Sequence, residues 1–441
     1  MTREEVVRKH KTYNLQSWSA QGSLNPKAIK RAEGIYLYDY DGTRYSDMSA
    51  QLVNMNLGHG NREIVEAIKE QADKFCYMAP SYAVESRGVL AEMIVDLMPD
   101  NIGKVFFTNA GADANENAVK IARMYTGRQK IFSRYRSYHG SSYGAANLTG
   151  EPRRFPSEPG IPGFVHFFDP YVYQEKIRFA SEEEAADFYV AKLREQILYE
   201  GAENVAAIVL ETITGSNGVI IPPKGYLPGV RKICDEFGIL LICDEVMAGW
   251  GRTGKMFAFE NFGIKPDLVT FAKGVTCGYV QLGGVAVSKK IAEYFDDHKL
   301  MCGLTYSGHP LACAAGVACV SYYTEHHILE HVCQVGKVLG EELEACRKDY
   351  ACVGDVRYIG LFSAIELVKD RETREPLVPY GQDPENRMGK IIGMLAARGF
   401  MTYSHENMII IAPPLIITEE QIREEMAKVK EVLAIVDKEF L

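Results

Sequence analysis

Two residues that could act together in catalysis, Asp244 and Lys273, each follow a short apolar run, at residues 239–243 and 268–271. Such runs, bounded by polar residues and glycine, are typical of buried strands in a parallel sheet. Open α/β sheets bind their ligands at the carboxyl ends of the strands. The sequence therefore predicts that a carboxylate and an amine face the same crevice.

This pair favours one kind of chemistry. A lysine between small residues at a buried strand end can lose its charge and attack an aldehyde as a free amine. A buried carboxylate can keep a pyridine nitrogen protonated, which turns the ring into an electron sink. These are the two groups that pyridoxal 5'-phosphate (PLP) requires from a protein. Lys273 alone would be interpreted as a solvated strand-end lysine, but its spacing from Asp244 favours the catalytic interpretation.

Composition limits the possible classes of function. The chain has 441 residues, 47% of them hydrophobic, which is enough for a large core and favours two lobes. A net charge of −9 argues against nucleic acid or an anionic membrane as partner. None of the ten cysteines forms a C-x-x-C pair, so we expect a reducing, cytoplasmic setting with neither disulfides nor a metal site. The N-terminus lacks an apolar signal segment, and no apolar run reaches membrane-spanning length, so we expect a soluble protein that is not exported.

The elements that must position the pair can be located along the chain. Asp41-Gly42 predicts a hairpin turn between apolar runs. Strands are predicted at 105–108, 130–133, 206–211 and 408–412, an edge strand at 361–367, and helices at 62–75, 181–200, 328–348 and 386–398. We expect an N-terminal segment at 1–59 that joins the small lobe, a large cofactor-binding domain at 60–315 and a small C-terminal domain at 316–441.

A family resemblance rests on the stretch around the pair. DEVMAGWGRTG followed by PDLVTFAKG resembles the signature of class III (ω-amino acid type) PLP-dependent aminotransferases. The resemblance extends over nearly the whole chain. It implies an α/β protein of PLP fold type I, the aspartate aminotransferase-like fold. In this fold a large domain with a mostly parallel central sheet is joined to a small α/β domain.

The resemblance also implies roles for individual residues. Lys273 would hold the cofactor and move the proton, and Asp244 would hold the ring nitrogen, with Glu211 beside it. Small residues at a strand-to-helix turn would bring backbone amides to the phosphate. Family members commonly carry hydroxyl residues at Ala110 and Ala112 and Glu at Asp113, so phosphate binding here would depend more on the backbone. The other cofactor residues implied are Gly111 and Ala112 at the phosphate, His139, and Tyr138 and Val246 on the two ring faces.

One implied contact concerns assembly. In the family, the threonine of the element that contains Thr305 reaches the phosphate in the neighbouring subunit. The resemblance therefore implies a homodimer, or a dimer of dimers, with shared active sites.

Substrate choice is inferred from differences within the family. GABA and ornithine aminotransferases carry arginines at the positions of Ser141 and Ile410. They carry a glutamate at the position of Ser216. The segments LTGEPRRFPSEPGIPGFVHFFDPY and MIIIAPPLIIT most resemble those of taurine transaminases. This similarity implies taurine as donor and 2-oxoglutarate as acceptor, with β-alanine or pyruvate as open alternatives. The predicted substrate-binding residues are Trp18, Arg154 and, less strongly, Arg153.

Three alternative functions differ from this one in cofactor, reaction or class. Gly249–Gly254 matches G-x-G-x-x-G, the pattern of nicotinamide-dependent oxidoreductases, but bulky Trp250 and Arg252 interrupt the expected turn. An aminomutase, racemase or decarboxylase could use the same fold and cofactor. A PLP-binding regulator would need a DNA-binding segment, and the sequence contains no basic helix-turn-helix pattern.

Overall fold

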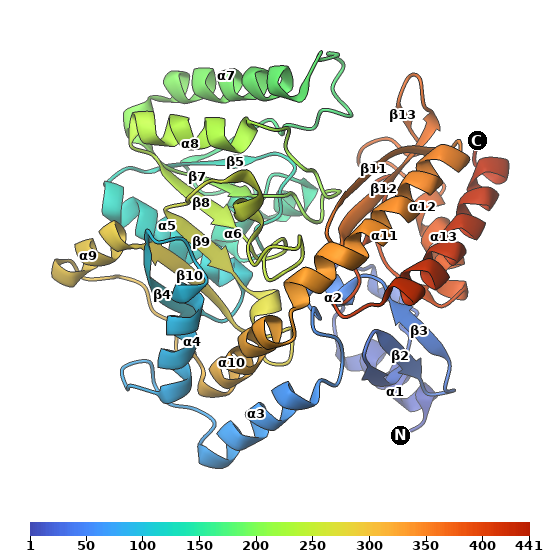
Figure 1. The fold of residues 1–441 in the computed structure, drawn as a ribbon, viewed down its shortest axis with the longest axis horizontal. Coiled ribbons are helices and arrows are strands. Elements are labelled where there is room, and N and C mark those ends of the chain that lie inside the picture. Colours follow the sequence, from blue (N-terminus) through green and yellow to red (C-terminus); the bar gives the residue numbers. More distant parts are fainter.

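The computed structural model describes all 441 residues, and its centre is a seven-stranded sheet (Figure 1). All strands run parallel except β10, which pairs antiparallel with both of its neighbours. This is the mostly parallel central sheet that the family resemblance implies for the large domain. In spatial order the strands are β4 (Ile102–Thr108), β10 (Gly283–Ser288), β9 (Leu268–Phe271), β8 (Leu240–Asp244), β7 (Val205–Glu211), β5 (Lys130–Arg134) and β6 (Phe164–Phe167).

The central strands are buried on both faces, which explains their continuous apolar sequences. In β8, Leu240 and Ile242 pack toward α5 (Gly111–Thr126), whereas Leu241 and Cys243 pack toward α8 (Tyr226–Phe237). Alternate residues of a strand point to opposite faces of a sheet, so both sets must be apolar when helices cover both faces. Figure 1 shows α7 (Glu182–Glu200) stacked outside α8. The other helices of this region are α3 (Arg62–Lys74), α4 (Glu85–Asp96), α6 (Tyr143–Leu148), α9 (Lys289–Asp297) and α10 (Pro310–Glu325).

A second sheet joins the two ends of the chain. The predicted hairpin is confirmed as β2 (Tyr36–Asp39) and β3 (Arg44–Asp47), and β1 (Ile29–Glu33) extends it. β3 then pairs in parallel with β14 (Phe400–Met401), from the far end of the sequence. The Ser46 hydroxyl also donates a hydrogen bond of 2.7 Å to the carboxylate of Glu425, which lies in the last helix of the chain. The N-terminal segment also contains α1 (Arg3–Tyr13) and α2 (Ala50–Val53).

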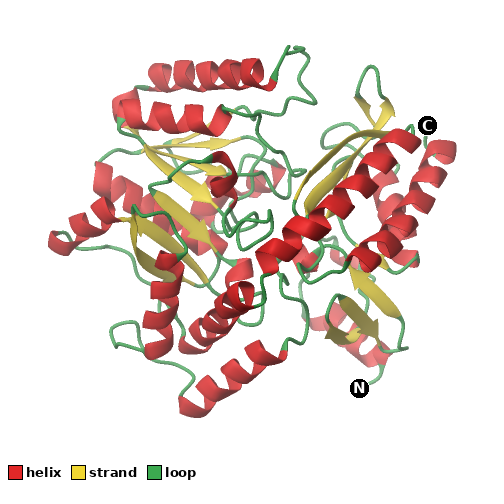
Figure 2. Cartoon of the chain, viewed as in Figure 1, coloured by secondary structure: helices red, strands yellow, loops and turns green.

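The third sheet lies in the C-terminal region (Figure 2). Its strand β12 (Phe362–Asp370) pairs with β11 (Val353–Ile359) on one side and with β16 (Met408–Ile411) on the other. The prediction of an edge strand at 361–367 is therefore wrong. The mixed polar and apolar sequence of β11 does not identify it as a strand that pairs with β12. The sheet also contains β13 (Glu375–Pro376) and β15 (Ser404–His405), and its helices are α11 (Ile328–Asp349), α12 (Arg387–Ala397) and α13 (Glu419–Glu439).

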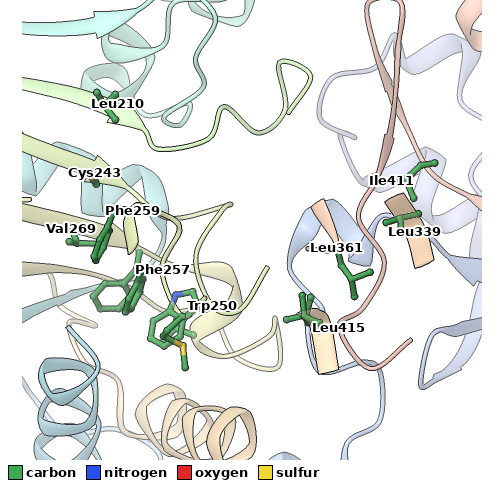
Figure 3. Close-up of a cluster of buried hydrophobic side chains, with 14 of the residues drawn as sticks. Leu210, Cys243, Trp250, Phe257, Phe259, Val269, Leu339, Leu361, Ile411 and Leu415 are labelled. Atoms are coloured by element: carbon green, nitrogen blue, oxygen red, sulfur yellow. The ribbon is translucent and has the colours of Figure 1, made fainter. Parts of the chain in front are cut away.

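The segment after β8 joins the central sheet to the C-terminal region. Figure 3 shows Trp250, Phe257 and Phe259 between the central strands and residues such as Leu361 and Leu415. Trp250 is fully buried, with its ring centroid 5.2 Å from that of Phe257. The glycine pattern at 249–254 therefore belongs to the core and opens no helix, which removes the structural basis for a dinucleotide site. No helix is both long and apolar enough to cross a membrane.

Candidate active site

A cavity of about 950 Å³ opens at the carboxyl ends of the parallel strands. The last residues of β7 and β8 and the residues that follow β9 form its base, and loops from both ends of the chain complete its rim. This is the crevice that the positions of Asp244 and Lys273 predict. Of the residues singled out from the sequence, the cavity is lined by Trp18, Gly111, Ala112, Tyr138, His139, Ser141, Arg153, Glu211, Ser216, Asp244, Val246 and Lys273.

Asp244 is the best-supported side chain of the cavity. Its Oδ2 accepts hydrogen bonds from His139 Nδ1 at 2.7 Å and from Asn115 Nδ2 at 2.8 Å. Its Oδ1 accepts one from the Val246 amide at 3.0 Å. Asn115 is itself fixed, because its Oδ1 accepts a bond from the Thr270 hydroxyl at 2.8 Å. These contacts hold the carboxylate in one orientation at the end of β8.

Lys273 begins a 3₁₀ turn directly after β9 and has a backbone φ of 47°. This left-handed conformation is uncommon for a residue other than glycine and costs roughly 1–2 kcal/mol. Burial lowers the pKa of the Lys273 amine, and the nearby Asp244 opposes this shift only in part. The amine therefore loses its proton more readily than an exposed lysine does, as a nucleophile or base requires.

Glu211 ends β7 beside Asp244 and supports the next loop. Its Oε1 accepts the Tyr138 amide at 3.0 Å, and its Oε2 accepts the Gly215 amide at 2.7 Å. Burial raises the pKa of the Glu211 carboxyl, and the neighbouring Asp244 raises it further. Glu211 therefore positions the residue predicted to stack on the cofactor ring.

The amino end of α5 opens into the cavity with small residues. The first turn of a helix leaves backbone N–H groups without helical partners, and these groups favour anions. A Cβ on Gly111 would lie 2.9 Å from a methyl carbon of Val246, so this close approach requires glycine. Gly140, at φ +133°, comes so near Ala112 that an added Cβ would lie 2.5 Å from the Ala112 Cβ. The close approach of the two segments therefore requires glycine at position 140.

The rim is built from loops and carries charge. Arg153 lies over the Tyr138 ring, 3.8 Å from its centroid, and its Nη2 donates to the Ser216 hydroxyl at 3.0 Å. Arg153 Nε donates to the Glu151 carboxylate. The Trp18 ring meets Tyr138 edge-on, with the centroids 6.3 Å apart. Arg153, Trp18 and Tyr138 thus form one group above the base of the cavity.

Two predicted residues are not brought into this cavity. Arg154 pairs with Glu158 at 3.0 Å and lies outside the cavity lining, whereas Arg153 is part of that lining. Thr305 is exposed and lies outside the cavity lining; its carbonyl accepts a bond from the Tyr77 hydroxyl at 2.8 Å. Ile410 is fully buried in β16 and also lies outside the lining.

Sequence reasoning missed several residues of the site. Asn115 carried a signal, because it follows Gly111 by one helical turn and is therefore on the same face of α5. Glu151 stands two residues before Arg153, and nothing in the local sequence indicates that it lines the cavity. His405 and Glu406 line the cavity from the far end of the chain, and nothing local marks them.

The family model described as aminotransferase class-III matches residues 18–433. The chain belongs to the class III aminotransferases. It is therefore an enzyme that moves an amino group from an amine to a keto acid, and its cofactor is PLP.

This aminotransferase is similar to several named proteins. It superposes with a TM-score of 0.98 on the taurine:2-oxoglutarate aminotransferase from Bifidobacterium kashiwanohense in complex with PLP and glutamate, at 55% identity over 100% of this chain and 99% of that one. It is 32% identical to the taurine–pyruvate aminotransferase of Bilophila wadsworthia, over 99% of this chain and 98% of the relative. It is 34% identical to the putrescine–pyruvate aminotransferase of Pseudomonas aeruginosa, over 93% of this chain and 92% of the relative.

The cavity of this aminotransferase fits its cofactor. It offers a lysine of lowered pKa, a firmly positioned carboxylate, and a helix amino end crowded so closely that only glycine fits at position 111. These match the aldehyde, the pyridine nitrogen and the phosphate of PLP, in that order. When bound, PLP supplies the electron sink that lets a proton leave the carbon next to the amine.

Proposed function

We propose that this aminotransferase moves the amino group of taurine to 2-oxoglutarate, giving sulfoacetaldehyde and L-glutamate. The observation that carries the proposal is the 55% identity to the Bifidobacterium taurine:2-oxoglutarate aminotransferase over the whole chain. Proteins that share a fold can differ in substrate because loops make many of the substrate contacts. The identity to the Bifidobacterium enzyme includes these loops, so it supports a shared substrate.

The residues at the base of the cavity divide the chemistry between them. Lys273 binds the cofactor and moves the proton between substrate carbon and cofactor, because its lowered pKa leaves it able to act as a base. Asp244, oriented by His139 and Asn115, supports the positive charge on the ring nitrogen. Tyr138 and Val246 enclose the ring, and Gly111 and Ala112 present backbone amides to the phosphate.

The rim selects the anion. Arg153 is the only arginine among the residues that line the cavity, and its guanidinium has donors for a sulfonate or a carboxylate. The Trp18 ring lies next to the Arg153 guanidinium, so the two residues close the same side of the cavity. Ser141 and Ser216 offer no charge where related enzymes for GABA and ornithine carry charged residues. The recognition of the substrate anion therefore falls to Arg153.

The active site is completed by a second subunit. Thr305, Tyr306 and Tyr77 form an exposed cluster outside the cavity, with the Tyr77 and Tyr306 ring centroids 5.7 Å apart. Exposed aromatic side chains of this kind are typical of interfaces between proteins. In the proposed homodimer, Thr305 contacts the phosphate in the partner's cavity.

Pyruvate is the second candidate acceptor, because the 32% identical relative from Bilophila wadsworthia is named a taurine–pyruvate aminotransferase. Pyruvate carries one carboxylate and 2-oxoglutarate carries two, and the Arg153 guanidinium has donors for either acceptor. We favour 2-oxoglutarate because the protein to which this chain is 55% identical is named for that acceptor.

The absorbance of the holoenzyme tests the proposal. Taurine added without acceptor should convert the band of the lysine-bound cofactor, at about 410–430 nm, to the shorter-wavelength band of the aminated cofactor. 2-Oxoglutarate should then restore the first band faster than pyruvate does. A spectrum that responds to other ω-amines but not to taurine would exclude taurine as donor and leave the family assignment intact.

A further inference from the structure

The loop that carries Lys273 has an unusual backbone. Lys273 and Cys277 have φ angles of 47° and 50°, in the left-handed region that side chains other than glycine disfavour. Both residues lie in the loop between β9 and β10, at the base of the cavity. Strained residues of this kind persist only where the surrounding structure holds them in place. Contacts from outside the loop must therefore support it.

One side chain from outside the loop hydrogen-bonds to the backbone of residues 272–277. The Tyr323 hydroxyl, near the end of α10, donates to the Gly274 carbonyl at 2.9 Å and lies 3.2 Å from Cys277 Sγ. The other hydrogen bonds to this stretch of backbone come from within the loop. Tyr323 therefore contacts the loop directly after Lys273 and again at Cys277, next to both left-handed residues.

Tyr323 is itself held in place by its surroundings. It is 1% exposed, and the Trp250 ring stacks beside it, with the ring centroids 6.4 Å apart and the planes at 29°. Trp250 also packs against the loop, because a Cβ on Gly274 would lie 2.5 Å from the Trp250 Cβ. Trp250, the bulky residue in the glycine pattern at 249–254, therefore fixes both the phenol ring and the peptide to which its hydroxyl bonds.

We infer that Tyr323 is a positioning residue for Lys273: its hydroxyl fixes the Gly274 carbonyl and so holds the Lys273 backbone in the conformation that presents the amine to the cavity. The inference rests on the role of Lys273 proposed above and does not depend on which amine is the donor. Tyr323 is not part of the cavity lining, so it acts on the reaction only through Lys273. Its loss should weaken the bond between Lys273 and the cofactor without changing how the cofactor fits the cavity.

Competition between two forms of the cofactor separates these effects. Pyridoxine 5'-phosphate has an alcohol where PLP has its aldehyde, so it can occupy the same cavity but cannot bond to Lys273. Added to the PLP-loaded enzyme, it lowers the absorbance of the lysine-bound cofactor at about 410–430 nm as it displaces PLP. The concentration that displaces half of the PLP, at a fixed concentration of free PLP, measures how much the bond to Lys273 adds to binding.

Tyr323→Phe is the decisive variant, because it removes only the hydroxyl. We expect half-displacement at an about tenfold lower concentration of pyridoxine 5'-phosphate than in the wild type. We also expect kcat to fall by about tenfold, while the KM for the amine donor stays within about threefold.

The matched control is Tyr322→Phe. It removes the same hydroxyl from the preceding residue of α10, whose ring stacks on His326 with the centroids 3.8 Å apart. This variant should behave as wild type in the competition and in the steady-state rates.

Three results would overturn the inference. Half-displacement of Tyr323→Phe at the wild-type concentration would show that the hydroxyl does not position Lys273. A variant that retains neither PLP nor pyridoxine 5'-phosphate, or an equal loss in Tyr322→Phe, would show that these hydroxyls support the fold in general. Failure of the proposed role of Lys273 looks different, because the wild type itself would then lack the band of the lysine-bound cofactor.

Discussion

The base and the rim of the cavity are built in opposite ways. At the base, Asp244 ends β8, Asn115 lies on α5 and His139 lies in the loop after β5; all three are almost fully buried and are joined by hydrogen bonds of 2.7–2.9 Å. At the rim, Trp18 is 62% exposed, and Trp18 and Glu406 both lie outside helices and strands. The difference suggests that the sheet fixes the cofactor chemistry, whereas loops choose the substrate.

The strongest test of this division is Lys273→Ala. If the base performs the chemistry, activity should fall by about 10⁴-fold with every amine donor. Steady-state rates with taurine and with ethylamine measure the loss. A residual rate that differs greatly between the two donors would place substrate selection at the base as well and break the division.

Asp244→Asn should have the next largest effect. The amide keeps the shape of the side chain but loses the charge that supports the ring nitrogen, so kcat should fall by about 10²- to 10³-fold. Cofactor content, measured by absorbance, must be matched to that of the wild type. An unchanged kcat at full cofactor occupancy would remove Asp244 from the chemistry.

Arg153→Gln tests the rim. Loss of a charged hydrogen bond of about 1.5–3 kcal/mol should raise the KM for taurine by about 10- to 100-fold. Ethylamine has no anion to bind, so its KM should stay within about twofold of wild type. An equal rise for both amines would assign Arg153 to general packing of the cavity instead of anion recognition.

The buried amine at the base should also be visible in stability. Because the folded-state pKa of Lys273 is lowered, the unfolded chain binds this proton more tightly, and stability is lost as pH falls below the pKa of an exposed lysine. In the enzyme freed of cofactor, Lys273→Met should therefore unfold at higher urea than wild type at pH 7. The difference should shrink as the pH approaches 10, and urea midpoints across this range provide the check.

The smallest effect is expected for Arg154→Gln. Arg154 pairs with Glu158 outside the cavity, so the KM for taurine should stay within about twofold of wild type. A rise as large as that of Arg153→Gln would restore the order given by the sequence and show that the rim rearranges when substrate binds.

The base could be predicted from the sequence because its signals are local. Asp244 and Lys273 stand at the ends of apolar runs, and β9 was located to the residue. The strands at 130–133, 206–211 and 408–412 were also found, within a residue or two at their ends. A strand that is buried on both faces needs apolar residues at consecutive positions, so it can be recognised from the sequence.

The rim could not be predicted in the same way, because its partners come from distant parts of the chain. Two adjacent arginines have the same local sequence, and only the fold turns Arg153 inward and Arg154 outward. Glu406 reaches the cavity because β15 pairs with β16, and its loop carries no distinguishing pattern. The wrong assignment of residues 361–367 as an edge strand has the same origin, because β11 alternates polar and apolar residues too irregularly to be recognised as a neighbouring strand.

The parallel pairing of β3 with β14 has a consequence for synthesis of the chain. β3 emerges from the ribosome roughly 350 residues before its partner, which at about 5–20 residues per second leaves its edge unpaired for about 20–70 s. An unpaired strand edge is a template for pairing with other chains. A strand in about the last tenth of the sequence therefore protects a strand near its beginning, and a chain that stops before Phe400 would carry an exposed edge that no later residue covers.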